Sequence, residues 1–143
     1  WLYFGSVRSS SLSHAGGTRL TGFAWGYGHL LVFGGIALGA VGVELAIEAA
    51  HEHHGISGVG RACLAGGLGA YVLAVAAIHA VTVRGIDGVV AWRIACAGAV
   101  AVAAASAAGL PAPLGLAVVG APVVALVIGE GTAGRRRAAP APA

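Results

Sequence analysis

Charged residues are scarce in this sequence, and three common polar residue types are missing from it. Only 9% of the 143 residues are charged, and Lys, Asn and Gln do not occur. Soluble domains carry about 25% charged residues, so this chain has too few to build a water-facing surface. The sequence also has no Met and opens on an aromatic, apolar run, residues 1–4. We therefore expect it to be the C-terminal part of a longer protein. The missing N-terminal half of the same protein is then expected to be a partner of this C-terminal part.

Long apolar stretches make up most of what is present. The composition is 58% hydrophobic, and the mean hydropathy is +0.89. A helix needs about 20 largely apolar residues to cross the ~30 Å hydrocarbon core of a bilayer, and backbone groups in lipid must be paired within the segment. The sequence therefore predicts an all-α, multi-pass transmembrane helix bundle in a lipid bilayer. Its four spans are expected at about 23–47, 62–83, 89–108 and 110–128.

The arginines orient this bundle. If the C-terminus is cytoplasmic, seven of the eight arginines fall on the inner side, and only Arg61 falls outside. This asymmetry predicts an N-in, C-in topology. Heavy use of Ala, Gly, Val and Arg indicates a GC-rich bacterial genome, so the bilayer is expected to be a bacterial inner membrane. Residues 1–22 are then the end of a preceding span plus a cytoplasmic loop. Residues 129–143, which contain three consecutive arginines and an Ala/Pro-rich end, are expected to form a disordered, basic cytoplasmic tail.

Small residues recur at helical spacing and predict how the spans pack. Lipid supplies no hydrophobic drive for helix pairing, so small side chains that allow close backbone approach mark the contact faces. Cys63 and Cys96 are expected to be small packing residues as well. The predicted contact faces are Gly28, Gly35, Gly39, Gly42 and Ala46 in the first span, Ala62, Gly66, Ala70 and Ala74 in the second, and Ala95, Ala99 and Ala103 in the third.

A few polar residues within the spans are the candidates for function. Ionisable groups are expensive in a membrane, so each is a default functional hypothesis. The candidate intramembrane polar site consists of Tyr27, His29, Glu44 and His79. The predicted topology places the two histidines and Arg93 at one depth near the cytoplasmic face. The alternative is that the histidines and Arg93 only reach interfacial water, as long basic side chains near a helix end commonly do.

Other motifs carry less information. Glu44, Glu48 and the polar run at 51–54 could face a divalent metal ion, but a solvated helix exit explains them more simply. A GxGxxG match at 129–134 follows a membrane span rather than a strand, so it does not indicate a dinucleotide site. The sequence thus predicts no catalytic residue, no metal ligand, no cofactor and no nucleic-acid partner. A homo-oligomer is compatible with it.

Several of these segments resemble one family. The residues that carry the resemblance are Trp1-Leu2-Tyr3-Phe4, Trp25-Gly26-Tyr27-Gly28-His29-Leu30, Gly35-Ile36 and Gly42-Val43-Glu44-Leu45-Ala46-Ile47. They are similar to the C-terminal portion of bacterial low temperature requirement protein A (LtrA). Leu2 stands where that family often has a second Trp, and the His-rich exit at 51–54 replaces a shorter turn. The resemblance implies a multi-pass membrane protein, and it implies no defined biochemical activity.

Two function classes remain open, and a third has little support. The first is transport of a small solute or of protons through polar intramembrane residues. The second is a structural or scaffolding membrane protein without catalysis. The third, an intramembrane enzyme, lacks a recognisable nucleophile or metal signature in this sequence.

Overall fold

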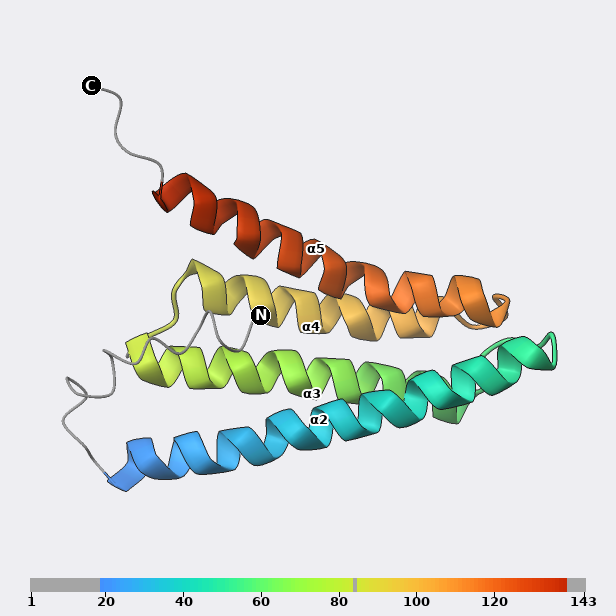
Figure 1. The fold of residues 1–143 in the computed structure, drawn as a ribbon, viewed down its shortest axis with the longest axis horizontal. Helices are drawn as coiled ribbons and strands as arrows, with labels where there is room; N and C mark the ends of the chain where they lie inside the picture. The colour runs from blue at the N-terminus through green and yellow to red at the C-terminus, as the bar shows by residue number, and fades with distance from the viewer. Residues whose placement is uncertain (1–18, 84, 139–143) are drawn as a thin grey trace.

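Four helices account for almost all of the described residues. The computed structural model describes residues 19–83 and 85–138, so the aromatic motif at 1–4 and most of the predicted cytoplasmic loop lie outside the described residues. The helices are α2 (Arg19–His51), α3 (Gly58–Val83), α4 (Gly88–Ser106) and α5 (Ala112–Ala138). Consecutive helices run antiparallel and lie side by side in chain order (Figure 1).

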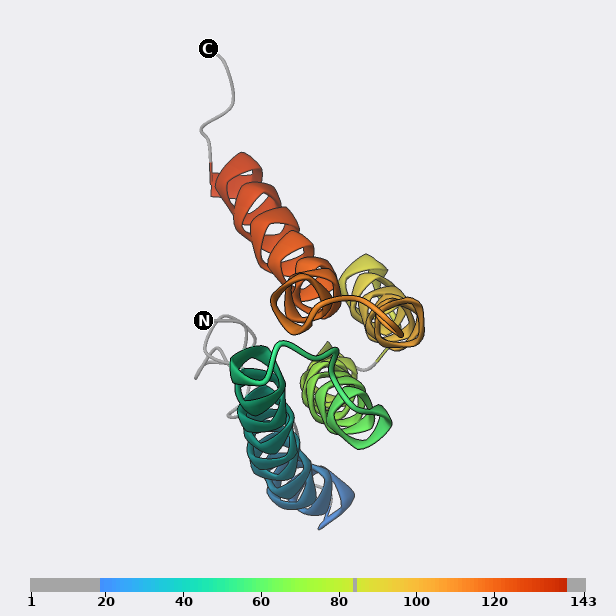
Figure 2. The same cartoon turned by 90° about the vertical axis from the view of Figure 1, so that its right-hand side faces the viewer.

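The loops at one end tie the outermost helices together. At this loop end, which comprises residues 52–57 and 107–111, the Ala112 amide donates to the His54 carbonyl at 3.2 Å. Gly55 and Pro111 also pair as an isolated β-bridge. The ends of α2 and α5 therefore meet here, as the end-on view in Figure 2 shows. At the opposite end the last turns of α5 diverge from α4 (Figure 1).

All four helices can cross a bilayer. Each contains a segment long and apolar enough to span it, over Gly26–His51, Gly58–Val83, Gly88–Ser106 and Ala112–Ala133. Large apolar side chains cover the outside of the bundle, including Leu30 and Phe33 on α2, both 65% exposed. A water-soluble bundle would hide such residues, whereas hydrocarbon accommodates them. The predicted all-α, four-span architecture is confirmed.

Most helix ends differ from the predicted span ends, and two extensions at the C-terminal ends matter most here. Helix α2 continues to His51, four residues beyond the predicted end of the first span. Helix α5 continues to Ala138, although residues from 129 onward were predicted to be a disordered tail. The prediction was based on the loss of apolar character after Ile128, but a polar contact described below holds this part of the helix.

A histidine ends α2. His53 has a φ of +58°, the left-handed conformation usually taken by glycine. The His54 amide donates to the Ala49 carbonyl at 2.9 Å, and the His53 amide donates to the Ala50 carbonyl at 3.2 Å. This pair of bonds is the Schellman motif, which satisfies carbonyls left open at a helix end. Part of the His-rich exit thus has a structural role in capping the helix.

Glycine brings α2 and α3 into backbone contact. A methyl group on Gly35 would lie 2.8 Å from the Tyr71 amide nitrogen, and one on Gly42 would lie 2.6 Å from the Leu64 amide nitrogen. A methyl group on Gly67 would collide with the backbone nitrogen of Gly39. The predicted glycine face of the first span therefore is the contact face with α3.

The predicted faces of the next two spans need correction. On α3 the closest approach is at Gly67, which the sequence did not single out, whereas Ala62 is exposed. On α4, Ala95 and Ala99 are exposed. The residues of α4 that are buried are instead Val90, Arg93, Cys96, Ala97, Val100 and Ala104. Because alanine occurs on every side of α4, its spacing does not identify the buried face.

Helix α4 packs against both α3 and α5 through a repeating stripe. Val90, Arg93, Ala97, Val100 and Ala104 on α4 are spaced alternately three and four residues apart, as in antiparallel helix pairs. Val119 and Leu126 on α5 are fully buried against this region. The thiol of Cys96 donates to the Pro122 carbonyl at 3.3 Å. Both cysteines are free, and Cys96 has the packing role expected of it.

Candidate functional site

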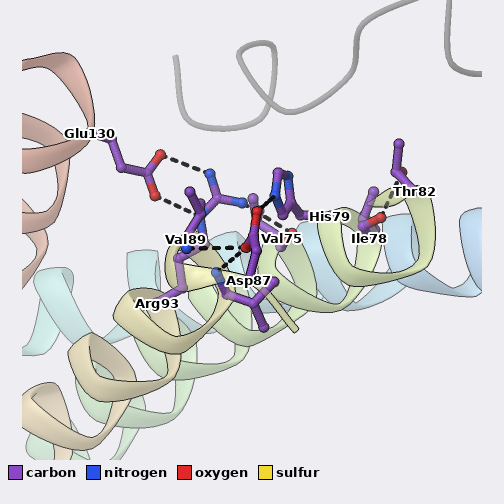
Figure 3. Close-up of polar contacts among 9 residues, drawn as sticks. Val75, Ile78, His79, Thr82, Asp87, Val89, Arg93 and Glu130 are labelled. Atoms are coloured by element: carbon purple, nitrogen blue, oxygen red, sulfur yellow. Dashed lines mark hydrogen bonds and ion pairs between the residues drawn. The ribbon is translucent and has the colours of Figure 1, made fainter. Parts of the chain in front are cut away.

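A buried ion pair joins α4 to α5. Arg93 Nε lies 2.7 Å from Glu130 Oε1, and Arg93 Nη2 lies 2.8 Å from Glu130 Oε2 (Figure 3). A third donor, Arg93 Nη1, reaches the Val75 carbonyl of α3 at 3.3 Å. The Arg93 side chain is 3% exposed, whereas that of Glu130 is 20% exposed. One guanidinium of α4 thus contacts two other helices, α3 and α5, and pairs with Glu130 in the bidentate geometry that gives the strongest arginine–carboxylate pairing.

The helical hairpin brings these two residues together. Arg93 lies 18 residues before Pro111, and Glu130 lies 19 residues after it. In an antiparallel pair, residues equally distant from the turn lie at the same level. A methyl group on Gly129 would lie 3.4 Å from the indole nitrogen of Trp92, which agrees with this register. The small side chain of Gly129 lets α5 approach α4 directly beside the ion pair.

The ion pair corrects two predictions. The alternative in which Arg93 only reaches interfacial water is wrong, because Arg93 is buried within the bundle and Glu130 and Val75 accept its hydrogen bonds. Glu130 was considered only as part of the GxGxxG match at 129–134, which does not indicate a dinucleotide site. Its segment was predicted to be disordered. The equal spacing of one base and one acid from the hairpin turn is the sequence signal that could have identified the pair.

A second polar pair lies at the same end of the bundle. His79 Nε2 is 3.1 Å from Asp87 Oδ2. The other carboxylate oxygen of Asp87 caps α4, accepting from the amides of Val89 at 3.1 Å and Val90 at 2.9 Å. These amide bonds, above all the one from Val90, and the contact with His79 hold the pKa of Asp87 below its ordinary value. Asp87 is therefore a carboxylate at neutral pH.

His79, Asp87, Arg93 and Glu130 together form what we call the polar cluster. Val75 and His79 are four residues apart on α3, so the carbonyl that binds Arg93 is about one helical turn from His79. Figure 3 shows the two pairs, with Glu130 reaching Arg93 from α5 and His79 of α3 facing Asp87. His79 Nδ1 is buried and has no hydrogen-bond partner among residues 19–83 and 85–138. The cluster thus contains two acids, one permanent cation and one imidazole.

Of the four predicted site residues, only His79 belongs to the polar cluster. Tyr27 is 61% exposed on α2, and His29 is partly exposed. A methyl group on Gly28 would lie 2.9 Å from Ile78 Cγ1, so this part of α2 lies at the level of the residue next to His79. His29 is thus at a similar depth to His79, but it lies on a different helix.

Glu44 lies at the other end of the bundle. It is exposed between the buried residues Gly42 and Ala46, which face α3. Its neighbour Leu45 is close to Gly60, where an added methyl group would lie 3.3 Å from Leu45 Cβ. Gly60 is in the first turn of α3, so Glu44 is near the loop end and about 24 Å along α2 from Gly28. The structure does not bring Glu44 together with the polar cluster.

The acidic and histidine-rich exit of α2 was weighed as a metal site. Within residues 19–83 and 85–138, no group of three or more His, Cys, Asp or Glu side chains is arranged to hold a metal ion. His53 and His54 instead provide the backbone of the Schellman motif.

Comparison with known families gives one match. The sequence model described as "Bacterial low temperature requirement A protein (LtrA)" matches residues 1–128, most of the chain. The chain belongs to the LtrA family. The resemblance inferred from the motifs in the first fifty residues is therefore confirmed. No curated protein and no solved structure matches the sequence.

Membership of the LtrA family agrees with the four apolar helices of the structure. The protein is a multi-pass membrane protein of a bacterial family, with four candidate spans in the described part of the chain. His79, Asp87 and Arg93 lie within the matched residues of this LtrA family member. Glu130 lies two residues beyond them.

Proposed function

We propose that this LtrA family protein moves protons or a small solute across the bacterial inner membrane, and that the polar cluster lines the path. The observation that carries the proposal is the Arg93–Glu130 ion pair, buried among three spans. Charged residues inside membrane helices are rare and commonly mark ion or proton pathways. The N-in, C-in topology favoured by the arginines would place the polar cluster near the cytoplasmic face.

The geometry supports Glu130 as the group that changes state. A guanidinium keeps its charge at all physiological pH values, so only the carboxylate of the pair can take up a proton. Glu130 is the more accessible partner, at 20% exposure against 3% for Arg93. A proton on Glu130 would remove its charge and weaken both hydrogen bonds to Arg93. Binding of a proton and separation of α5 from α4 would therefore be linked.

The second pair supports a route from the surface. Asp87 lies in the turn between α3 and α4, and its side chain is 44% exposed. It contacts His79, whose side chain is 16% exposed and whose other ring nitrogen is buried. An imidazole accepts a proton on one nitrogen and releases one from the other. Asp87 and His79 would therefore exchange protons between the surface and the interior of the cluster.

Flux measurements test the proposal. The full-length protein is reconstituted in liposomes that contain a pH-sensitive dye, and proton flux is followed after a pH jump and an applied potential. We expect E130Q and H79Q to lower the flux at least tenfold. E48Q, which removes an exposed carboxylate near the loop end, is the matched control and should retain it.

The originally predicted residues are tested in the same way. Transport of protons or of a small solute that is unchanged in H29A, E44Q, H79Q and E130Q would refute the transport hypothesis. If transport is lost in H29A or E44Q but retained in E130Q, the path follows α2 rather than α5.

A scaffolding role is the alternative, and the α2–α3 contact favours it. Backbone contact at Gly35, Gly39 and Gly67 gives a rigid pair whose outer face carries large apolar residues. A scaffold predicts that G35L disrupts assembly while E130Q and H79Q are silent. Transport predicts functional loss in E130Q with assembly intact, so gel filtration and flux on the same samples separate the two.

A further inference from the structure

A shallow, open depression lies at the loop end, at the opposite end of the bundle from the polar cluster. It has a volume of about 220 Å³ and opens to the outside between the start of α3 and the end of α4. Arg61 is its only charged lining residue, and the others are glycine or alanine: Gly58, Ala62, Ala65, Ala104 and Ala105. The small side chains leave room beside a guanidinium. We call this depression the Arg61 notch.

Arg61 uses only part of its hydrogen-bonding capacity within the bundle. Its Nη1 donates to the Ala104 carbonyl at 3.1 Å. Ala104 is in the last turn of α4, where carbonyls have no intrahelical partner, so this bond caps the helix. Arg61 Nε is buried and has no hydrogen-bond partner in the part of the chain that the structure describes. A guanidinium has five N–H donors, so with one used in capping and Nε enclosed, the remaining Nη hydrogens are the donors that a ligand could reach.

The notch lies at the level of lipid headgroups. Arg61 is in the first turn of α3, and Ala104 is two residues before the end of α4, so both are at the boundary of the apolar segments. The N-terminus of α3 adds the partial positive charge of the helix dipole, although the Gly60 amide already donates to Ser57 Oγ at 3.0 Å. Val59 and Val102, 68% and 70% exposed, present apolar surface on the same two helices. A phospholipid with its phosphate at Arg61 and its acyl chain against the exposed valines would match this arrangement of positive charge and apolar surface.

We propose that the Arg61 notch binds the headgroup of an anionic phospholipid. The phosphate would accept from the free guanidinium donors, and the alanine-lined floor would contact the glycerol and upper acyl carbons. Arginine suits this ligand because its planar donors pair with phosphate oxygens. The proposal is independent of proton or solute transport, because the notch and the polar cluster lie at opposite ends of the bundle.

The competing explanation is that Arg61 serves only to cap α4. The two explanations differ in what glutamine and lysine do at this position. R61Q keeps one donor for the Ala104 carbonyl but has no charge. R61K keeps the charge but lacks the planar, bidentate N–H donors of a guanidinium. Capping alone predicts no change in lipid preference for either variant.

Lipid retention provides the test. The full chain is reconstituted in vesicles of equal parts phosphatidylglycerol and phosphatidylcholine, extracted in mild detergent, and the retained lipids are quantified by mass spectrometry. We expect the wild type to retain phosphatidylglycerol preferentially. R61Q should lower that preference about fivefold, as expected for one basic side chain near the membrane surface, with R61K intermediate.

A second substitution separates the notch from general charge. A62L fills the notch while keeping Arg61, and should lower the preference like R61Q. A101L makes the same change at an exposed alanine that does not line the notch, and should leave it unchanged. Circular dichroism verifies that each variant is helical. Equal retention of phosphatidylglycerol by folded wild type, R61Q and A62L would overturn the proposal and assign any preference to another surface.

Discussion

The two outer helix contacts of this bundle are built in opposite ways. Between α2 and α3 the contact is made by backbone against backbone, at Gly35, Gly39 and Gly67. Between α4 and α5 the contact is a stripe of branched and small side chains that ends in the Arg93–Glu130 ion pair. The α2–α3 contact depends on the absence of side chains at these glycines. The α4–α5 contact depends on the side chains of Arg93 and Glu130.

This difference shows how each contact responds to its surroundings. Van der Waals contact between backbones does not change with pH or with ligands. An ion pair inside the membrane is stable only while both charges are present and satisfied. The α2–α3 contact is therefore independent of charge, whereas the α4–α5 contact includes a pair that depends on the Glu130 carboxylate.

Removal of Glu130 should have the largest effect on stability. E130L leaves Arg93 charged and buried without its partner, which should lower the free energy of unfolding by about 3–5 kcal/mol. The double variant R93M/E130L removes both charges and should recover most of the loss. Unfolding in mixed micelles, followed by circular dichroism, measures both. A loss of stability in the double variant equal to that in E130L would mean that packing, not charge, governs this contact.

A methyl group on Gly67 should have the next largest effect. G67A inserts an atom against the backbone of Gly39, and such overpacking typically lowers the free energy of unfolding by about 1–3 kcal/mol. G69A is the matched control on the same helix, because an added methyl group there meets nothing within 4 Å. It should be neutral or slightly stabilising. The same unfolding assay compares the two, and equal stability would contradict a backbone-limited contact.

Asp87 should have the smallest effect, and that effect should depend on pH. Loss of the helix cap in D87A should cost about 1 kcal/mol at neutral pH. Because the folded-state pKa of Asp87 is lowered, its stabilisation is present above the ordinary carboxyl pKa and is lost as pH falls through the folded value. D87N can cap without titrating, so its thermal midpoint should fall less than that of the wild type between pH 5 and pH 3. Parallel curves would contradict this role.

The sequence predicted the architecture well because hydrocarbon imposes a simple rule on length and composition. It also identified the glycine face of α2, where small residues stand out among large ones such as Phe33 and Leu38. It did not identify the face of α4, where alanine lies on all sides. Composition indicates which segments enter the membrane, but it indicates a helix face only where residue sizes contrast.

The candidate site was predicted only in part, for a different physical reason. His79 was identified from its position within an apolar span. Arg93 was noted with interfacial water as an alternative, and Glu130 was missed because it follows the apolar run. A search for single polar residues in spans cannot find a pair whose burial depends on both members. The symmetric positions of the pair about Pro111 would have revealed it.

The approach of Gly39 to Gly67 also has a consequence for motion. Two helices whose main chains touch have no room to slide or rotate past each other, so α2 and α3 should behave as a single rigid unit. Helix α5 has its firm attachment at the loop end and its breakable one at Glu130. Any rearrangement of this bundle should therefore be a swing of α5 about the loop end, with the other helices serving as the stationary frame.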